Sequence, residues 1–170
     1  MGLSGVISPQ SLIHGKSVHI DFKQNIARYA GKNTKICKLK HPEYSVKTLS
    51  LEGIIRPIIS VFLDEQSAAI PFLIDTGASS TYMDLQFLEN ISKIDNHESQ
   101  GMAGIKKQAN VYGPITLLIG KAKVLLPKVV GESMPKKSKL GMDLLQNSTL
   151  ILMKNGKIKL KFNPENSEKY

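Results

Sequence analysis

Short runs of alternating hydrophobic and polar residues, separated by turn residues, make up most of this 170-residue chain. Alternation with a period of two is typical of β-strands that bury one face. We expect an N-terminal β-hairpin over 17–29 and further strands over 54–63, 70–74, 111–119, 122–130, 149–153 and 157–162. The last two strands are joined by Lys154-Asn155-Gly156, and Asn-Gly between two such runs strongly favours a hairpin. The pattern therefore predicts an all-β fold.

Helical spacing is limited to two short stretches. Leu85, Leu88 and Ile91 recur at intervals of three residues, which predicts a short surface helix or a loop between residues 84 and 94. A turn into a second short helix is expected at 140–145, where Leu-Gly-Met-Asp-Leu-Leu follows the preceding segment. One or two short helices therefore accompany the strands.

The composition along the chain divides it into four parts. Residues 1–30 contain the N-terminal hairpin. Residues 31–50 are rich in lysine and show little periodicity, so we expect a linker with at most a short strand at 44–46. Residues 51–164 contain most of the predicted strands and form the main lobe, and residues 165–170 are a polar tail.

Residues 12–26 and 144–158 contain similar types of residue in the same order. Each has a leucine-rich helix end, a polar break, a strand, a turn with lysine and asparagine, and a returning strand. Such similarity is the signature of a repeated supersecondary unit. Residues 1–30 would then be the closing elements of an earlier copy of this unit. Two hairpins of similar length also align this loosely by chance, so both interpretations stay open.

The overall composition is that of an ordinary soluble globular protein, with 41% hydrophobic and 22% charged residues. No apolar run approaches the roughly 18 to 20 residues that span a bilayer, and residues 1–10 lack the basic and apolar parts of a signal peptide. Cys37 is the only cysteine, which excludes an internal disulfide and a cysteine-based metal site. We therefore expect a reducing, cytoplasmic location.

The net charge of +9 is unevenly distributed. Residues 51–120 hold four basic against eight acidic residues (−4), whereas 1–50 hold eight against two (+6) and 121–161 hold ten against two (+8). A basic surface can attract nucleic acid. The lysines of 157–161 alternate with apolar residues, however, which predicts the solvated face of a half-buried strand, and 6% aromatic residues provide no stacking platform. A nucleic-acid site is therefore not favoured.

The apolar run 70–74 leads directly into Asp75, Thr76 and Gly77. A carboxylate is costly to bury without partners, so an aspartate at the end of a buried strand is either hydrogen-bonded structurally or kept for chemistry. Glycine lets the chain turn sharply against another backbone, and the Thr76 hydroxyl can hold that turn. These residues are the candidate functional site.

The segment Asp75-Thr76-Gly77-Ala78-Ser79 resembles the active-site loop of the aspartic proteases. A lone Asp-Thr-Gly is a weak signal, but here a strand precedes it and Leu-Gly-x-Asp-Leu-Leu follows about 65 residues later, at 140–145. A glycine-rich stretch at 101–105 lies between them. The order and spacing of the three segments resemble a retropepsin-like aspartic protease lobe over roughly residues 52–162, which implies a closed, orthogonally packed β-barrel-like fold.

The resemblance implies an aspartic endopeptidase that acts on a peptide or protein substrate. In that family two such loops face each other, and the paired aspartates hold one water between them. Two carboxylates this close share a proton, so one acts as the general base on the water and the other, protonated, polarises the scissile carbonyl. The resemblance gives Asp75 the catalytic role, and it implies neither a metal nor an organic cofactor.

The same resemblance implies supporting roles around Asp75. Thr76 would reach across to the partner loop, and Gly77 would leave room for the substrate backbone. The residues so implied are, in the loop, Thr76, Gly77, Ala78 and Ser79; in a flap over the substrate, Gly101, Met102, Gly104 and Ile105; and in a hydrophobic-Gly element behind the loop, Leu140 and Gly141. From composition alone, 101–105 is equally well an ordinary glycine turn at the head of a hairpin.

Two departures from the family pattern are visible. Lys139 stands where the family usually has an apolar residue before the second glycine. Retroviral members pair an aspartate in the loop with an arginine after that glycine, whereas this chain has Ser79 and Met142. Both charged partners of this ion pair are therefore absent, so no buried charge is left without a partner. The pattern favours cellular or bacterial retropepsin-like proteins over retroviral ones.

One Asp-Thr-Gly supplies only one of the two aspartates. The other candidates lack its setting, because Asp21 precedes Phe-Lys, Asp64 lies in a turn and Asp143 belongs to the later helix. Two sources stay open: a symmetric homodimer, or a preceding lobe of which residues 1–30 are the end. The alternative function is a catalytically silent retropepsin-like module for dimerisation or binding, since a fold does not guarantee an activity.

Overall fold

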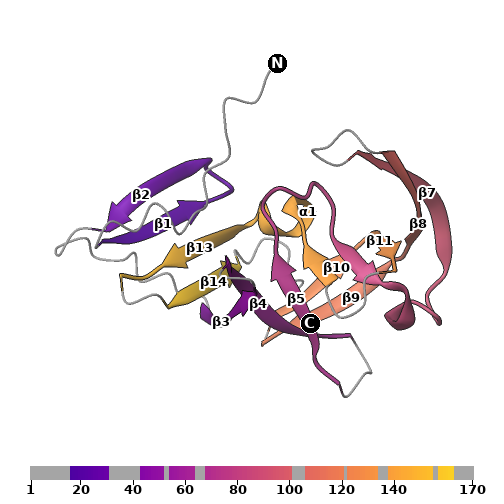
Figure 1. Cartoon of the computed structure of the whole chain (residues 1–170), viewed down its shortest axis with the longest axis horizontal. Helices are drawn as coiled ribbons and strands as arrows, with labels where there is room; N and C mark the ends of the chain where they lie inside the picture. The colour runs from indigo at the N-terminus through magenta and orange to yellow at the C-terminus, as the bar shows by residue number, and fades with distance from the viewer. Residues whose placement is uncertain are drawn as a thin grey trace.

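The computed structural model describes residues 16–30, 43–51, 54–63, 68–100, 106–120, 122–133, 138–154 and 157–162. This part of the chain is nearly all β, with one short α-helix and one short 3₁₀ turn (Figure 1). The expected all-β class is therefore confirmed. No helix in these residues is long and apolar enough to cross a membrane.

In chain order the elements are β1 (Ser17–Asp21), β2 (Ile26–Ala30), β3 (Glu43–Leu51), β4 (Ile54–Leu63), β5 (Ile70–Ile74), β6 (Tyr82–Asp84), the 3₁₀ turn η2 (Leu85–Phe87), β7 (Lys93–Gln100), β8 (Lys106–Tyr112), β9 (Ile115–Ile119), β10 (Ala122–Leu126), β11 (Val129–Glu132), β12 (Ser138–Leu140), α1 (Met142–Leu145), β13 (Ser148–Leu152) and β14 (Ile158–Phe162).

Backbone pairing joins these strands into one continuous sheet. Its order is β2-β1-β13-β14-β3-β4-β5-β12-β6-β11-β8-β7, and the β9–β10 hairpin joins it because β9 also pairs with β4. Figure 1 shows the β1–β2 hairpin beside β13 and β14 at one end of the molecule and the long β7–β8 pair at the opposite end. The candidate loop after β5 lies between these two ends.

Alternate residues of the middle strands form the hydrophobic core. In β5 the side chains of Ile70, Phe72 and Ile74 are buried, and β4 and β9 alternate in the same way. Burying one such side chain stabilises a fold by about 1.5–3 kcal/mol. Strand β13, which pairs with β1 and β14, is buried at every position, so both of its faces are covered. The apolar runs at 54–63, 70–74 and 149–153 therefore became strands β4, β5 and β13.

Two of the expected strands are each divided in the structure. The run 111–119 breaks at Gly113-Pro114, where the peptide bond is cis, and the run 122–130 breaks at Pro127. Gly113 has φ of 153° and lies directly against the Pro127 carbonyl, so that a side chain there would overlap it. The two breaks therefore lie side by side, and β9 and β10 remain paired as the expected hairpin.

Strand β3 is longer than the short strand expected at 44–46. It covers nine residues and pairs with β14 on one side and β4 on the other, so residues 43–50 belong to the sheet rather than to a linker. Its own sequence has weak alternation, and its partners supply the hydrogen bonds that fix it. Residues 31–42 of the expected linker and the tail 165–170 lie outside the described residues.

The expected solvated lysine face of β14 is wrong at one position. Lys161 has only 2% of its surface exposed, and Lys159 is half-buried. The side of β14 that carries the lysines is therefore covered at Lys161, although its pattern of alternation is that of a half-exposed strand. The alternation of lysine with apolar residues therefore predicted the strand but not the exposure of its polar side.

Candidate functional site

Strand β5 carries Asp75 to the border of the core. The strand is held between β4 and β12, and its last residue, Ile74, is buried. The side chain of Asp75 that follows is 31% exposed. The backbone N–H of Asp75 donates to the Leu140 carbonyl at 3.0 Å. The carboxylate thus has a fixed backbone beneath it and an open side toward solvent.

The two oxygens of the Asp75 carboxylate have different neighbours. Oδ1 accepts a hydrogen bond from the Gly77 N–H at 3.0 Å, and Oδ2 lies 3.7 Å from Nζ of Lys139. A Cβ at Gly77 would lie 3.3 Å from Oδ1, so the turn is tight at this point. The hydrogen bond within the loop orients the carboxylate, and the lysine places a positive charge beside it.

The loop after Asp75 is attached from behind to the start of α1. Met142 N–H donates to the Ala78 carbonyl at 2.8 Å, and Asp143 N–H donates to the Ser79 carbonyl at 3.2 Å. Gly141 lies so close to the Ser80 backbone that a Cβ there would overlap its carbonyl group. The hydrophobic-Gly element therefore lies directly against the candidate loop, and Leu140 beside it is fully buried.

Thr81 and Asp143 join the two segments through a partly buried polar contact. The Asp143 carboxylate accepts hydrogen bonds from the Thr81 N–H at 2.8 Å and the Thr81 hydroxyl at 2.7 Å, while the Thr81 hydroxyl accepts from Gly141 N–H at 3.2 Å. Hydrogen bonds to a charged group contribute about 1.5–3 kcal/mol each. Sequence reasoning missed this pair, and its only signal was the acidic residue in the Leu-Gly-x-Asp segment.

Lys139 is a second site residue that sequence reasoning recorded only as a departure from the family pattern. It lies in β12, between buried Ser138 and Leu140, and its own side chain is 35% exposed. Because β12 pairs with both β5 and β6, Lys139 reaches Asp75 on one side and lies 5.9 Å from the ring centroid of Tyr82 on the other. It therefore connects the candidate carboxylate to Tyr82.

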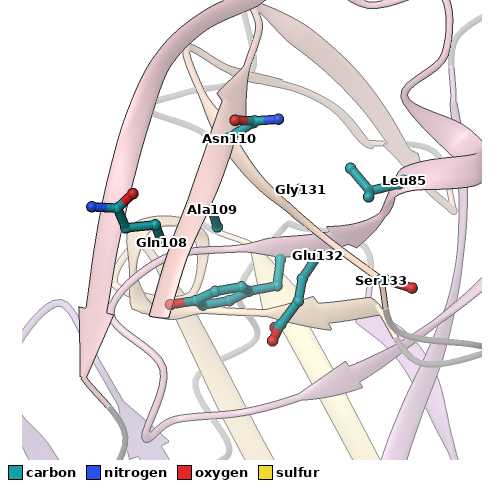
Figure 2. A pocket seen from close by; sticks show the side chains of 8 residues that line it. Leu85, Gln108, Ala109, Asn110, Gly131, Glu132 and Ser133 are labelled. Carbon is teal, nitrogen blue, oxygen red and sulfur yellow. The ribbon is translucent and has the colours of Figure 1, made fainter. Parts of the chain in front are cut away.

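A pocket of about 210 Å³ opens beside Tyr82. In Figure 2 its walls come from β8, which carries Gln108 to Asn110, and from the segment that carries Gly131 to Ser133. A Cβ at Gly131 would lie 2.8 Å from a methyl carbon of Leu85, so the absence of a side chain here lets Leu85 approach the backbone closely. Pockets for whole small-molecule ligands usually measure about 300–1,000 Å³. The volume here is below that range, so the pocket is large enough for a group of about the size of one side chain.

The remaining expected site residues divide into two groups. Thr76, Gly77 and Ser79 are exposed on the open side of the loop, and Ala78 is half-buried. The expected flap residues Gly101, Met102, Gly104 and Ile105 lie outside the described residues. The strands on either side, β7 and β8, pair as far as Gln100 and Lys106.

Comparisons with known proteins add no relative. No protein-family model matches this chain, and no curated protein sequence matches it. Within the part of the chain that the structure describes, no group of three or more His, Cys, Asp or Glu side chains is placed to hold a metal ion.

Proposed function

We propose that this chain is one lobe of a retropepsin-like aspartic endopeptidase in which Asp75 is one of two carboxylates that activate a water molecule. One observation carries the proposal. The Asp75 carboxylate is presented, one third exposed, on a loop whose backbone is fixed from behind by residues 140–143. Such a loop leaves its open side for a second carboxylate and a substrate.

In this mechanism the two carboxylates have different roles. Nζ of Lys139 lies 3.7 Å from Oδ2 of Asp75, so this carboxylate has a cation on one oxygen and a backbone N–H on the other. Asp75 is then the general base that takes a proton from the water. The second aspartate carries the shared proton and polarises the scissile carbonyl. The Gly77 N–H holds Oδ1 in place throughout.

The pocket beside Tyr82 supports a peptide substrate. Tyr82 lines the pocket and also lies near Lys139, which in turn contacts Asp75. Side-chain contacts through Tyr82 and Lys139 therefore connect the pocket to Asp75. Correct positioning of the scissile bond is a large part of enzymatic rate acceleration.

The test is the Asp75→Asn variant, expressed from its complete reading frame and assayed for cleavage of a peptide library from acidic to neutral pH. We expect cleavage to fall by at least about a thousandfold, because an amide cannot accept the proton of the attacking water. Glu89→Gln is the matched control, because it removes an exposed carboxylate in the turn before β7. This variant should cleave peptides like the wild type. Wild-type cleavage by Asp75→Asn would end the proposal.

A second candidate is a catalytically silent module of the same type, and Lys139 is the observation that favours it. A cation that already compensates Asp75 can replace the proton that a carboxylate pair would share. This candidate predicts no cleavage of any library peptide by the wild type and no thermal stabilisation by a statine-type inhibitor. Either cleavage or such stabilisation would remove it.

A further inference from the structure

The pocket beside Tyr82 has a carboxylate in its wall. Among the described residues that line it, Glu132 is the only Asp, Glu, Lys, Arg or His. Glu132 is the last residue of β11 and is half-buried. In the view of Figure 2 its side chain projects between Gln108 on one side and Leu85 on the other. A group that enters the pocket therefore meets one negative charge and no positive one in this lining.

The rest of the lining combines apolar surface with hydrogen-bond acceptors. Leu85 and Ala109 provide aliphatic contacts, whereas Gln108 and Asn110 each provide an amide oxygen. The face of an aromatic ring such as Tyr82 attracts a cation within about 6 Å. Lysine and arginine side chains pack their aliphatic stem against apolar surface and keep the charged end among polar groups. Both parts of such a side chain therefore find partners in this pocket.

Other occupants of a similar size fit the lining less well. An apolar side chain would cover Glu132, Gln108 and Asn110 without offering them a hydrogen bond, and burying polar groups without partners is costly. An acidic side chain would place a second negative charge beside Glu132. The pocket of about 210 Å³ therefore favours a basic side chain by both charge and hydrogen bonding.

The charges around the pocket agree with this preference. Glu132 lies in register with Asp84 of the neighbouring strand β6, and Asp84 is only 8% exposed, so its charge is weakly screened by solvent. A cation in the pocket would be attracted by both carboxylates. Lys139 lies 5.9 Å from the Tyr82 ring centroid, but it does not line the pocket, and its Nζ lies 3.7 Å from Asp75. The charge of Lys139 is therefore already opposed by a carboxylate outside the pocket.

We infer that this pocket binds the side chain of lysine or arginine and that Glu132 is the residue that selects it. For an arginine the carboxylate can accept two parallel hydrogen bonds from the guanidinium group, which adds geometric selection to the charge. The inference rests on the proposed function only for the next step, that the bound side chain belongs to a peptide substrate. The binding of a basic group follows from the pocket itself.

The first test measures binding without any cleavage. Nα-acetyl-arginine methylamide and Nα-acetyl-norleucine methylamide are titrated into the unaltered 170-residue chain while its backbone amide signals are followed by NMR. We expect the arginine probe to shift the signals of Asn110, Gly131 and Glu132 and to bind at least about tenfold more tightly than the norleucine probe, which has the stem without the charge.

Glu132→Gln keeps the shape of the side chain and removes its charge. This variant should bind the arginine probe about tenfold more weakly than the wild type and should keep the wild-type melting temperature. Glu89→Gln, at an exposed position outside the pocket, is the matched control and should bind like the wild type. Equal affinity of the wild type for the two probes, or an unchanged affinity of Glu132→Gln for the arginine probe, would overturn the inference.

The second test measures the same selection during cleavage of a peptide library. At one position of the substrate, kcat/KM of the wild type should be about tenfold higher for lysine or arginine than for norleucine. Glu132→Gln should lose this preference and still cleave the norleucine peptides at the wild-type rate. Cleavage with no preference that depends on Glu132 would overturn the inference. Binding of the arginine probe through Glu132 by a chain that cleaves no peptide would instead reject the proposed activity and leave the pocket assignment in place.

Discussion

Asp75 and Lys139 form the contact on which the candidate chemistry depends. Both side chains are about one third exposed, so their ion pair contributes only about 0–1 kcal/mol to the stability of the fold. Under the proposed mechanism the same contact would matter more for the reaction than for folding, because the cation lies 3.7 Å from an oxygen of the proposed base.

Replacing Lys139 with Leu tests this directly. Under the proposed mechanism kcat for peptide cleavage should fall about tenfold, equivalent to about 1.4 kcal/mol, because the contact that holds Oδ2 of Asp75 is lost. The melting temperature should change little. Lys139→Arg keeps the charge and should keep most of the activity. A Lys139→Leu variant that cleaves faster than the wild type would show that the lysine opposes the reaction.

Gly141 fixes the loop by having no side chain. Gly141→Ala should destabilise the protein by about 3 kcal/mol, because the new methyl group would overlap the Ser80 backbone, and overpacking costs about 1–3 kcal/mol even where side chains can move. Chemical denaturation followed by circular dichroism measures this. Gly77→Ala is the matched control, since its methyl group meets only a side-chain oxygen at 3.3 Å, and it should lose less than about 1 kcal/mol. Equal losses would contradict this account.

At the scale of single elements, the sequence predicted strands where each strand buries its own alternate residues. Strands β4 and β5 are of this kind. Strand β7 is not, because the residues from Lys93 to Glu98 are mostly exposed and polar, and only its pairing with β8 defines it. Pairing partners far along the chain are invisible in a local pattern.

The features of the candidate site also divide into those that were visible in the sequence and those that depend on contacts between distant residues. Asp75 and Gly141 were visible in the sequence, because a strand end and a close backbone approach leave local signals. The bonds from Thr81 to Asp143 and the contact from Lys139 to Asp75 span about 60 residues of sequence. Lys161 is buried although the local alternation predicts an exposed side chain there. Such features follow from tertiary packing, so the sequence alone could not give them.

The pocket is an element-scale feature, since β6, β8 and β11 meet around it. Gly131→Ala should narrow it, because the new Cβ would lie 2.5 Å from a Tyr112 ring carbon. We expect KM to rise about tenfold for peptides with a large side chain at this subsite and to change little for those with a small one. Ser133→Ala, at an exposed position of the same wall, is the control. An equal KM for both peptide classes would show that the pocket does not bind the substrate.

At the scale of the whole molecule, one sheet connects the N-terminal hairpin, the candidate loop and the β7–β8 pair. The position of Asp75 therefore depends on strands from both ends of the chain. The hairpin β1–β2 belongs structurally to the same sheet as β13 and β14, although residues 31–50 were expected to separate it from the main lobe. The sheet, and not the order of segments along the chain, therefore determines where the candidate loop lies.

The β1–β13 contact also affects the order in which the strands pair during folding. Val18 and Leu152 are 134 positions apart in the sequence (152 minus 18), so β1 can join only after a very long loop has closed. The entropic cost of closing a loop grows slowly with its length, but contacts between distant residues slow folding. The hairpin should therefore form its own turn early and join β13 late. During that interval the edge of β13 stays open, and in a crowded solution this is the step at which two unfinished chains could pair wrongly.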